Sequence, residues 1–144
     1  MKVLIVDGQG GKMGALLVKK LKELIPEQEI FAMGTNSIAT SAMLKSGADF
    51  AATGENPVVQ NSMDADLIIG PVGIIMAHAI LGEVTPKMAE AVGGSRAKKI
   101  LIPVNGCGVT VAGVKDMQLS GYVTDALHKA EQFILEAGAQ PDGA

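Results

Sequence analysis

A glycine-rich turn lies between the first apolar run and the first helical pattern, and it restricts the possible folds more than any other segment of the sequence. Residues 2–6 (KVLIV) have the composition of a buried strand, and the turn 7–14 (DGQGGKMG) leads into apolar residues at helical spacing over 12–25. Glycines permit a tight turn, and the following helix directs free N–H groups and the positive end of its dipole toward it. This order of elements predicts an anion-binding strand-turn-helix, with a turn that holds no ligand as the alternative.

The remainder of the chain repeats this alternation of short apolar runs and longer helical patterns, which is typical of βαβ units around a mostly parallel sheet. We predict further strands at 29–33, 49–53, 66–70, 98–104 and 108–113, and helices at 37–46, 57–62, 73–81, 86–92 and 118–137. The runs 66–70 and 98–104 are apolar almost throughout, as expected when helices cover both faces of a parallel sheet. The pattern predicts a single α/β domain over 1–138, three-layered, doubly wound and Rossmann-like, with a flexible tail over 139–144.

Composition narrows the classes of partner. The chain of 144 residues is long enough for one core but too short for a cofactor domain and a full substrate domain. A net charge of −3 argues against a nucleic-acid or anionic-membrane surface, which needs clustered Lys and Arg. The single cysteine, Cys107, fits a reducing compartment. We expect a cytoplasmic protein without a signal peptide or membrane span, whose partners are small molecules or proteins.

The glycine turn also matches a known pattern. The run IVDGQGGKMGALL resembles the N-terminal fingerprint of dihydrodipicolinate reductases and of some prephenate dehydrogenases, in which a glycine turn ending in Met-Gly binds NAD(P). The catalytic histidines and lysine of those reductases lie in a second domain that this chain lacks, so the resemblance implies cofactor binding without a complete catalytic apparatus. Gly8, Gly11, Met13 and Gly14 fall on that motif. Together with the rest of the turn, the candidate cofactor-binding residues here are Gly8, Gln9, Gly10, Gly11, Lys12, Met13 and Gly14.

A second resemblance covers nearly the whole chain. Through the segments GTNSIATSAMLKSGA, ATGEN, GPVGI and IPVN, the sequence is similar to a group of short uncharacterised bacterial proteins that form a family of unknown function. This resemblance supplies no activity, so the candidate site is derived from the residues themselves.

Ligands of open α/β sheets bind beyond the carboxyl ends of the strands. The candidates there are Thr35, Asn36 and Ser37 after the second strand, and Gly70, Pro71 and Gly73 after the fourth. The first three offer neutral donors for a 2′-phosphate or another anion, or they simply cap a helix. The second three would line the nicotinamide or nucleobase side, or they form only a structural turn. Because no Asp or Glu follows the second strand in the sequence, we expect a dinucleotide site here not to favour NAD over NADP.

The role of Asp7 distinguishes a nucleotide-binding protein from a Mg²⁺-dependent enzyme. A carboxylate at the start of a phosphate turn would repel an anion unless it bonds the loop amides, is protonated or holds Mg²⁺. The leading interpretation is a Rossmann-like protein that binds NAD(P) as its small-molecule nucleotide. One alternative is a Mg²⁺-dependent phosphotransfer or phosphate-ester enzyme, in which Asp7 holds the metal or is the nucleophile. The other is a non-enzymatic assembly or regulatory protein.

Self-association is also expected. The segments 73–81 (GIIMAHAIL) and 85–92 carry more apolar surface than one small sheet needs to cover, and His78 within the first of them fits a core or interface position. The sequence therefore predicts a homo-oligomer, with a symmetric dimer as the simplest form.

Overall fold

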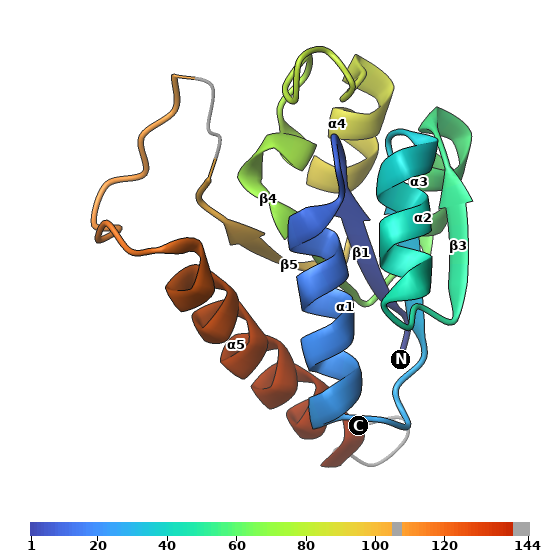
Figure 1. Ribbon diagram of the computed structural model, residues 1–144, viewed down its shortest axis with the longest axis vertical. Coiled ribbons are helices and arrows are strands. Elements are labelled where there is room, and N and C mark those ends of the chain that lie inside the picture. Colours follow the sequence, from blue (N-terminus) through green and yellow to red (C-terminus); the bar gives the residue numbers. More distant parts are fainter. Residues whose placement is uncertain (105–107, 140–144) are drawn as a thin grey trace.

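The computed structural model describes residues 1–104 and 108–139 (Figure 1). In this part of the chain one sheet has the strand order β3-β2-β1-β4-β5, with every neighbouring pair parallel. The strands are β1 (Val3–Asp7), β2 (Ile30–Gly34), β3 (Phe50–Thr53), β4 (Leu67–Pro71) and β5 (Lys98–Ile102). The helices are α1 (Lys12–Leu24), α2 (Ser37–Lys45), α3 (Glu55–Met63), α4 (Pro86–Gly93) and α5 (Leu119–Ala139), with a short 3-10 helix, η1 (Val72–Ile75).

The central strand β1 shows why both faces of the sheet are covered. All five of its residues are buried, and their side chains alternate between two hydrophobic cores. Val3 and Ile5 belong to the core beneath α1, α2 and α5, whereas Leu4 and Val6 belong to the core beneath α3 and α4. The strand order is that of the first five strands of the doubly wound dinucleotide-binding fold. The predicted fold class, a three-layer α/β domain, is therefore confirmed.

The predicted helix over 73–81 is wrong. After η1 the chain turns back on itself through His78, Ile80 and Leu81, whose φ angles are 68°, 56° and 53°. The amide of His78 donates to the carbonyl of Val84 at 2.7 Å, which closes this loop, and the His78 side chain is exposed. Within this segment Ile74 and Ala79 enter the core beneath α4, Ile74 from η1 and Ala79 from the loop, and such burial does not require helical spacing.

The predicted strand over 108–113 is also absent. Residues 108–118, which we call the arm, connect β5 to α5 through an extended and exposed course, while β5 itself ends at Ile102 (Figure 1). A strand forms only where a neighbour completes its hydrogen bonds, and within the described chain the arm has no neighbouring strand. Of the predicted tail, only Ala139 is described, and it ends α5.

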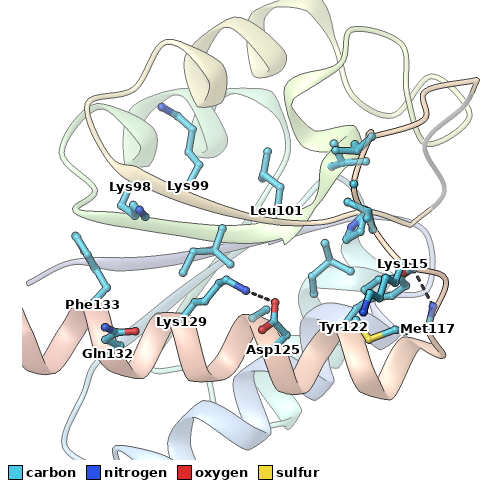
Figure 2. A pocket seen from close by; sticks show the side chains of 18 of the residues that line it. Lys98, Lys99, Leu101, Lys115, Met117, Tyr122, Asp125, Lys129, Gln132 and Phe133 are labelled. Atoms are coloured by element: carbon cyan, nitrogen blue, oxygen red, sulfur yellow. Dashed lines mark hydrogen bonds and ion pairs between the residues drawn. The ribbon is translucent and has the colours of Figure 1, made fainter.

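A cavity of about 920 Å³ lies between the edge strand β5, helix α5 and the arm (Figure 2). The Tyr122 hydroxyl donates to the carbonyl of Lys115 at 2.7 Å and accepts from the amide of Met117 at 3.1 Å. These two bonds fix the end of the arm to α5. Asp125 and Lys129, one helical turn apart on α5, form an ion pair on the wall of the cavity. The cavity is therefore framed by three segments, with the open edge of the sheet along one side.

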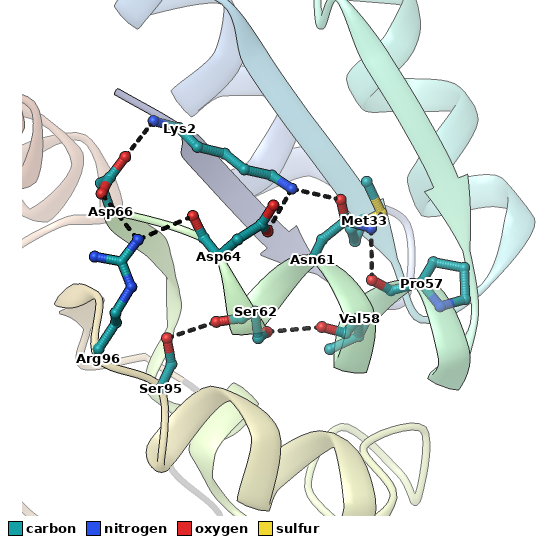
Figure 3. Close-up of polar contacts among 10 residues, drawn as sticks. All are labelled: Lys2, Met33, Pro57, Val58, Asn61, Ser62, Asp64, Asp66, Ser95 and Arg96. Carbon is teal, nitrogen blue, oxygen red and sulfur yellow. Dashed lines mark hydrogen bonds and ion pairs between the residues drawn. The ribbon is translucent and has the colours of Figure 1, made fainter.

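Polar contacts join the elements at the amino edge of the sheet (Figure 3). The amide of Lys2 donates to Asp66 at 2.6 Å, and its ammonium group reaches Asn61 at 3.0 Å and Asp64 at 2.7 Å. Arg96 lies 3.4 Å from Asp66. These contacts tie β1, the end of α3 and the start of β4 together at the edge opposite the glycine turn.

Gly14 sets the distance between α1 and the sheet. A Cβ at this position would lie 2.6 Å from the sulfur of Met43 and 2.8 Å from Cβ of Asp7. We expect Gly14→Ala to lower the free energy of unfolding, measured by urea titration, by about 1–3 kcal/mol. The matched control is Gly138→Ala on α5, where a Cβ meets nothing within 4 Å. That change should leave stability equal or higher, and equal losses in the two variants would contradict the close packing.

Candidate functional site

The glycine turn is tight and leaves several amides free. The Gly11 amide donates to the Gly8 carbonyl at 3.0 Å, and Gln9 and Gly11 adopt left-handed conformations with φ of 48° and 71°. Among the described residues, no hydrogen bond uses the amides of Gly10, Lys12 or Met13. Lys12 and Met13 open α1, where unpaired amides and the helix dipole together favour an anion.

Asp7 holds this turn from inside. Its Oδ1 accepts from the Gly8 amide at 2.8 Å and its Oδ2 accepts from the Gly14 amide at 2.7 Å. The residue is only 6% exposed, and this burial raises the pKa of the Asp7 carboxyl while the two amide bonds oppose the rise. Of the three roles that the sequence left open for Asp7, the structure shows the bonding of loop amides. Both carboxylate oxygens are therefore engaged, and Gly14 uses its amide for the protein itself.

A cavity of about 770 Å³ opens beside the turn. Two predicted groups meet in it, because the glycine turn lies on one side and Pro71 and Gly73 lie on the other. Gly70 is not part of its lining, since a Cβ there would lie 2.3 Å from the Val6 carbonyl oxygen inside the sheet. The lining residues that sequence reasoning missed are apolar ones, Ile80, Leu81, Val104 and Leu119.

The donors after β2 lie beside this cavity rather than in its lining, and they bind a carboxylate of the same chain. Glu83 Oε1 accepts from the Thr35 hydroxyl at 2.6 Å, the Asn36 side-chain amide at 2.7 Å and the Gln9 backbone amide at 3.0 Å. The side-chain Oδ1 of Asn36 accepts from the Ala39 amide at 2.9 Å, so Asn36 caps α2 as well. Ser37 is the first residue of that helix.

The structure therefore brings a carboxylate to the end of β2 that the residues following this strand in the sequence do not indicate. Glu83 is 48 positions from Thr35 in sequence, and it lies on the loop after η1, just beyond the segment 73–81 for which the sequence predicts a helix. Burial acts to raise the pKa of Glu83, but the hydrogen bonds from Thr35, Asn36 and Gln9 outweigh it and lower the pKa overall. The negative charge of Glu83 also contributes to the raised pKa of Asp7, so the two carboxylates interact electrostatically.

Other candidates remain outside the site or outside the described residues. Cys107 falls in the segment 105–107, which is not described. In the described ranges, no three His, Cys, Asp or Glu side chains gather as a metal site would require. Among the helices of the same ranges, none combines the length and the apolar composition of a membrane span.

Comparison with known proteins places the chain in a family. The family model for a domain of unknown function, DUF3842, matches residues 2–135. The chain belongs to this family. No curated protein is significantly similar in sequence. A dodecameric FMN-dependent Ubix-like decarboxylase from Escherichia coli O157:H7 has a similar crystal structure, with a TM-score of 0.47 and 17% identity over 91% of this chain and 76% of that one.

The DUF3842 assignment confirms the whole-chain resemblance to a family of unknown function. The shorter resemblance of the glycine turn to NAD(P)-binding reductases stays a prediction. What this DUF3842 domain can bind must therefore be argued from its own geometry.

Asp7→Asn tests how the glycine turn is held. An asparagine supplies one acceptor oxygen and one amide group, so one of the two buried N–H groups now bonded to Asp7 loses its acceptor. We expect the free energy of unfolding in urea to fall by about 1–3 kcal/mol. Asp116→Asn, on the exposed arm, is the control and should change stability far less. Similar unfolding curves for Asp7→Asn and the parent would show that Asp7 does not hold the turn.

Proposed function

We propose that this protein binds a nucleotide at the carboxyl edge of the sheet, with a phosphate group on the glycine turn and NAD(P) as the leading ligand class. One observation carries the proposal: the free amides of Gly10, Lys12 and Met13 lie at the start of α1, and these residues line a cavity of about 770 Å³. Amides at a helix N-terminus bind phosphate without needing a cationic side chain.

The place of this cavity in the topology supports the same proposal. It lies between the loops that follow β1 and β4, and the helices after these two strands cover opposite faces of the sheet. Nucleotides in doubly wound folds bind at such a switch point. The far wall carries Pro71, Gly73 and Val104, which suits the flat face of a nicotinamide or nucleobase better than a second charged group.

The geometry of Asp7 favours binding over phosphotransfer. A nucleophilic or metal-holding carboxylate needs an oxygen directed at its substrate or ion, whereas both oxygens of Asp7 accept backbone amides. We therefore assign Asp7 to the turn itself and propose a binding function. The alternative of a regulatory or assembly protein stays compatible with this proposal, since a bound nucleotide serves either role.

Gly10 offers the sharpest test of the proposed site. A Cβ there meets nothing within 4 Å, so Gly10→Leu fills the mouth of the cavity without disturbing the fold. Gly11 is unsuitable, because its φ is 71° and a Cβ would lie 2.6 Å from Ala39 Cα. We expect calorimetric titration with NAD⁺ and NADP⁺ to show at least tenfold weaker binding by Gly10→Leu than by the parent.

Gly138→Leu, at another exposed glycine, is the matched control and should bind as the parent does. Urea unfolding of all three proteins verifies that the fold is retained. Equal affinities of Gly10→Leu and the parent, or binding of neither dinucleotide by the parent, would contradict the proposed function.

We further propose that two copies associate through the arm. The side chains of Val109, Val111, Val114 and Met117 are 43–48% exposed, and β5 leaves one edge of the sheet without a partner strand in the described chain. An unpaired strand-forming segment and an open sheet edge in one molecule are complementary between two molecules, as in strand addition. The segment 85–92, by contrast, buries Met88, Ala89 and Val92 in the core, so it supplies less surface than its composition suggests.

Val111→Asp tests this association. A charge in the middle of the arm would be desolvated by strand addition, so we expect light scattering after size exclusion to show a shift from dimer to monomer. Ile38→Asp is the control, because Ile38 is 69% exposed on α2, away from the arm and β5. A monomeric parent, or equal masses for the parent and Val111→Asp, would exclude the arm as the interface.

A further inference from the structure

Glu83 occupies a special position among the charged groups of this protein. Its Oε1 accepts three hydrogen bonds from two separate loops: one from the Gln9 amide after β1 and two from the side chains of Thr35 and Asn36 after β2. No hydrogen bond within the described residues uses its second oxygen, Oε2. The carboxylate is therefore anchored through one oxygen, while the other keeps its capacity to accept.

The glycine turn is shaped to receive this carboxylate. A Cβ on Gly8 would lie 2.5 Å from the Thr35 hydroxyl, 3.0 Å from Glu83 Oε1 and 3.1 Å from Cγ2 of Ile80. Gly8 thus allows Glu83 and its loop to approach the backbone closely. The absence of a side chain at Gly8 is explained by contacts within the protein, before any ligand is considered.

The loop that delivers Glu83 carries local backbone strain. His78, Ile80 and Leu81 all lie in the left-handed region, which β-branched and bulky residues usually avoid. The loop is held on one side by Ala79 and Val84 in the core, and on the other by the three bonds to Glu83. A strained loop that ends in a fixed carboxylate is a feature expected of a functional position.

We infer that Glu83 is the residue that determines nucleotide specificity, accepting a ribose with free hydroxyls and excluding a 2′-phosphate. This inference rests on the proposed function. In dinucleotide-binding folds, an acidic residue after the second strand accepts the ribose hydroxyls. Here Glu83 lies beside the cavity, against Gln9 of its lining, and brings a carboxylate to the end of β2 from the connection between β4 and α4, with Oε2 as the atom that accepts the hydroxyl.

A 2′-phosphate would be disfavoured at this position for two reasons. The donors that could bind it, Thr35 and Asn36, already bond Glu83. The phosphate would also face the negative charge of Glu83, whose lowered pKa keeps it ionised at neutral pH. The preference that follows is for NAD⁺ over NADP⁺, opposite to the expectation drawn from the residues that follow β2 in the sequence.

Paired titrations of NAD⁺ and NADP⁺ into the parent and Glu83→Gln test the inference. Glutamine keeps the size of the side chain and its Oε1 acceptor but removes the charge. We expect the parent to prefer NAD⁺ by at least tenfold, and Glu83→Gln to reduce this preference at least tenfold by gaining affinity for NADP⁺. Glu90→Gln, at an exposed position on α4, is the control and should keep the parental ratio.

The outcomes separate this inference from the proposed function. If both dinucleotides bind but their affinity ratio is the same in the parent and Glu83→Gln, Glu83 has no role in specificity and the proposed function stands. If Glu83→Gln binds both dinucleotides more tightly by the same factor, Glu83 hinders dinucleotide binding in general and does not recognise the ribose hydroxyls, and the inference is overturned. If neither protein binds either dinucleotide, the proposed function and the inference both fail.

Discussion

The buried carboxylate of Asp7 is the interaction on which the geometry of the site depends. It joins the first residue after β1, Gly8, to the first turn of α1 at Gly14 through two short hydrogen bonds. A buried carboxylate is tolerated here because both oxygens are satisfied and the positive end of the helix dipole lies beside it. Through these bonds Asp7 fixes where α1 begins, and thereby where the remaining free amides of the turn lie.

This arrangement also limits how strongly the turn can attract an anion. Asp7 accepts a hydrogen bond from one amide of the first helical turn, and Glu83 accepts one from the amide of Gln9. These two amides are therefore not free to bind an anion. Lys12 is the cationic side chain in the cavity lining. Phosphate affinity at this site therefore has to come from the amides of Gly10, Lys12 and Met13 and from the helix dipole, and we expect it to be moderate.

The sequence allowed the sheet and the glycine turn to be predicted because both depend on local patterns. Apolar runs located the five strands of the described chain to within two residues, and the glycine spacing located the start of α1. The bonding of loop amides by Asp7 was among the alternatives that the sequence raised, since its partners Gly8 and Gly14 lie within seven positions. By contrast, no local signal connects Glu83 to Thr35, because their contact depends on the tertiary path of the loop after η1.

The two wrong element predictions have different physical causes. In 73–81, the buried residues Ile74 and Ala79 belong to an apolar composition that a helix and a packed loop share. The left-handed residues His78, Ile80 and Leu81 are not types that signal a turn. In 108–113, the strand-forming composition is real but no neighbouring strand is present in the described chain.

The course of the loop after η1 explains why these features belong together. A helix over 73–81 would have carried the chain away from the sheet edge, and Glu83 would not have reached the ends of β1 and β2. The short 3-10 helix and the reversal at His78 instead return the chain to the glycine turn, where Ile80 and Leu81 line the cavity and Glu83 meets Gln9. The three left-handed residues strain the backbone, but their conformations place the cavity wall of Ile80 and Leu81 and the carboxylate of Glu83 at the carboxyl edge of the sheet, beside the free amides. The loop after η1, part of which the sequence predicts as a helix, thus supplies the carboxylate of Glu83 to this edge.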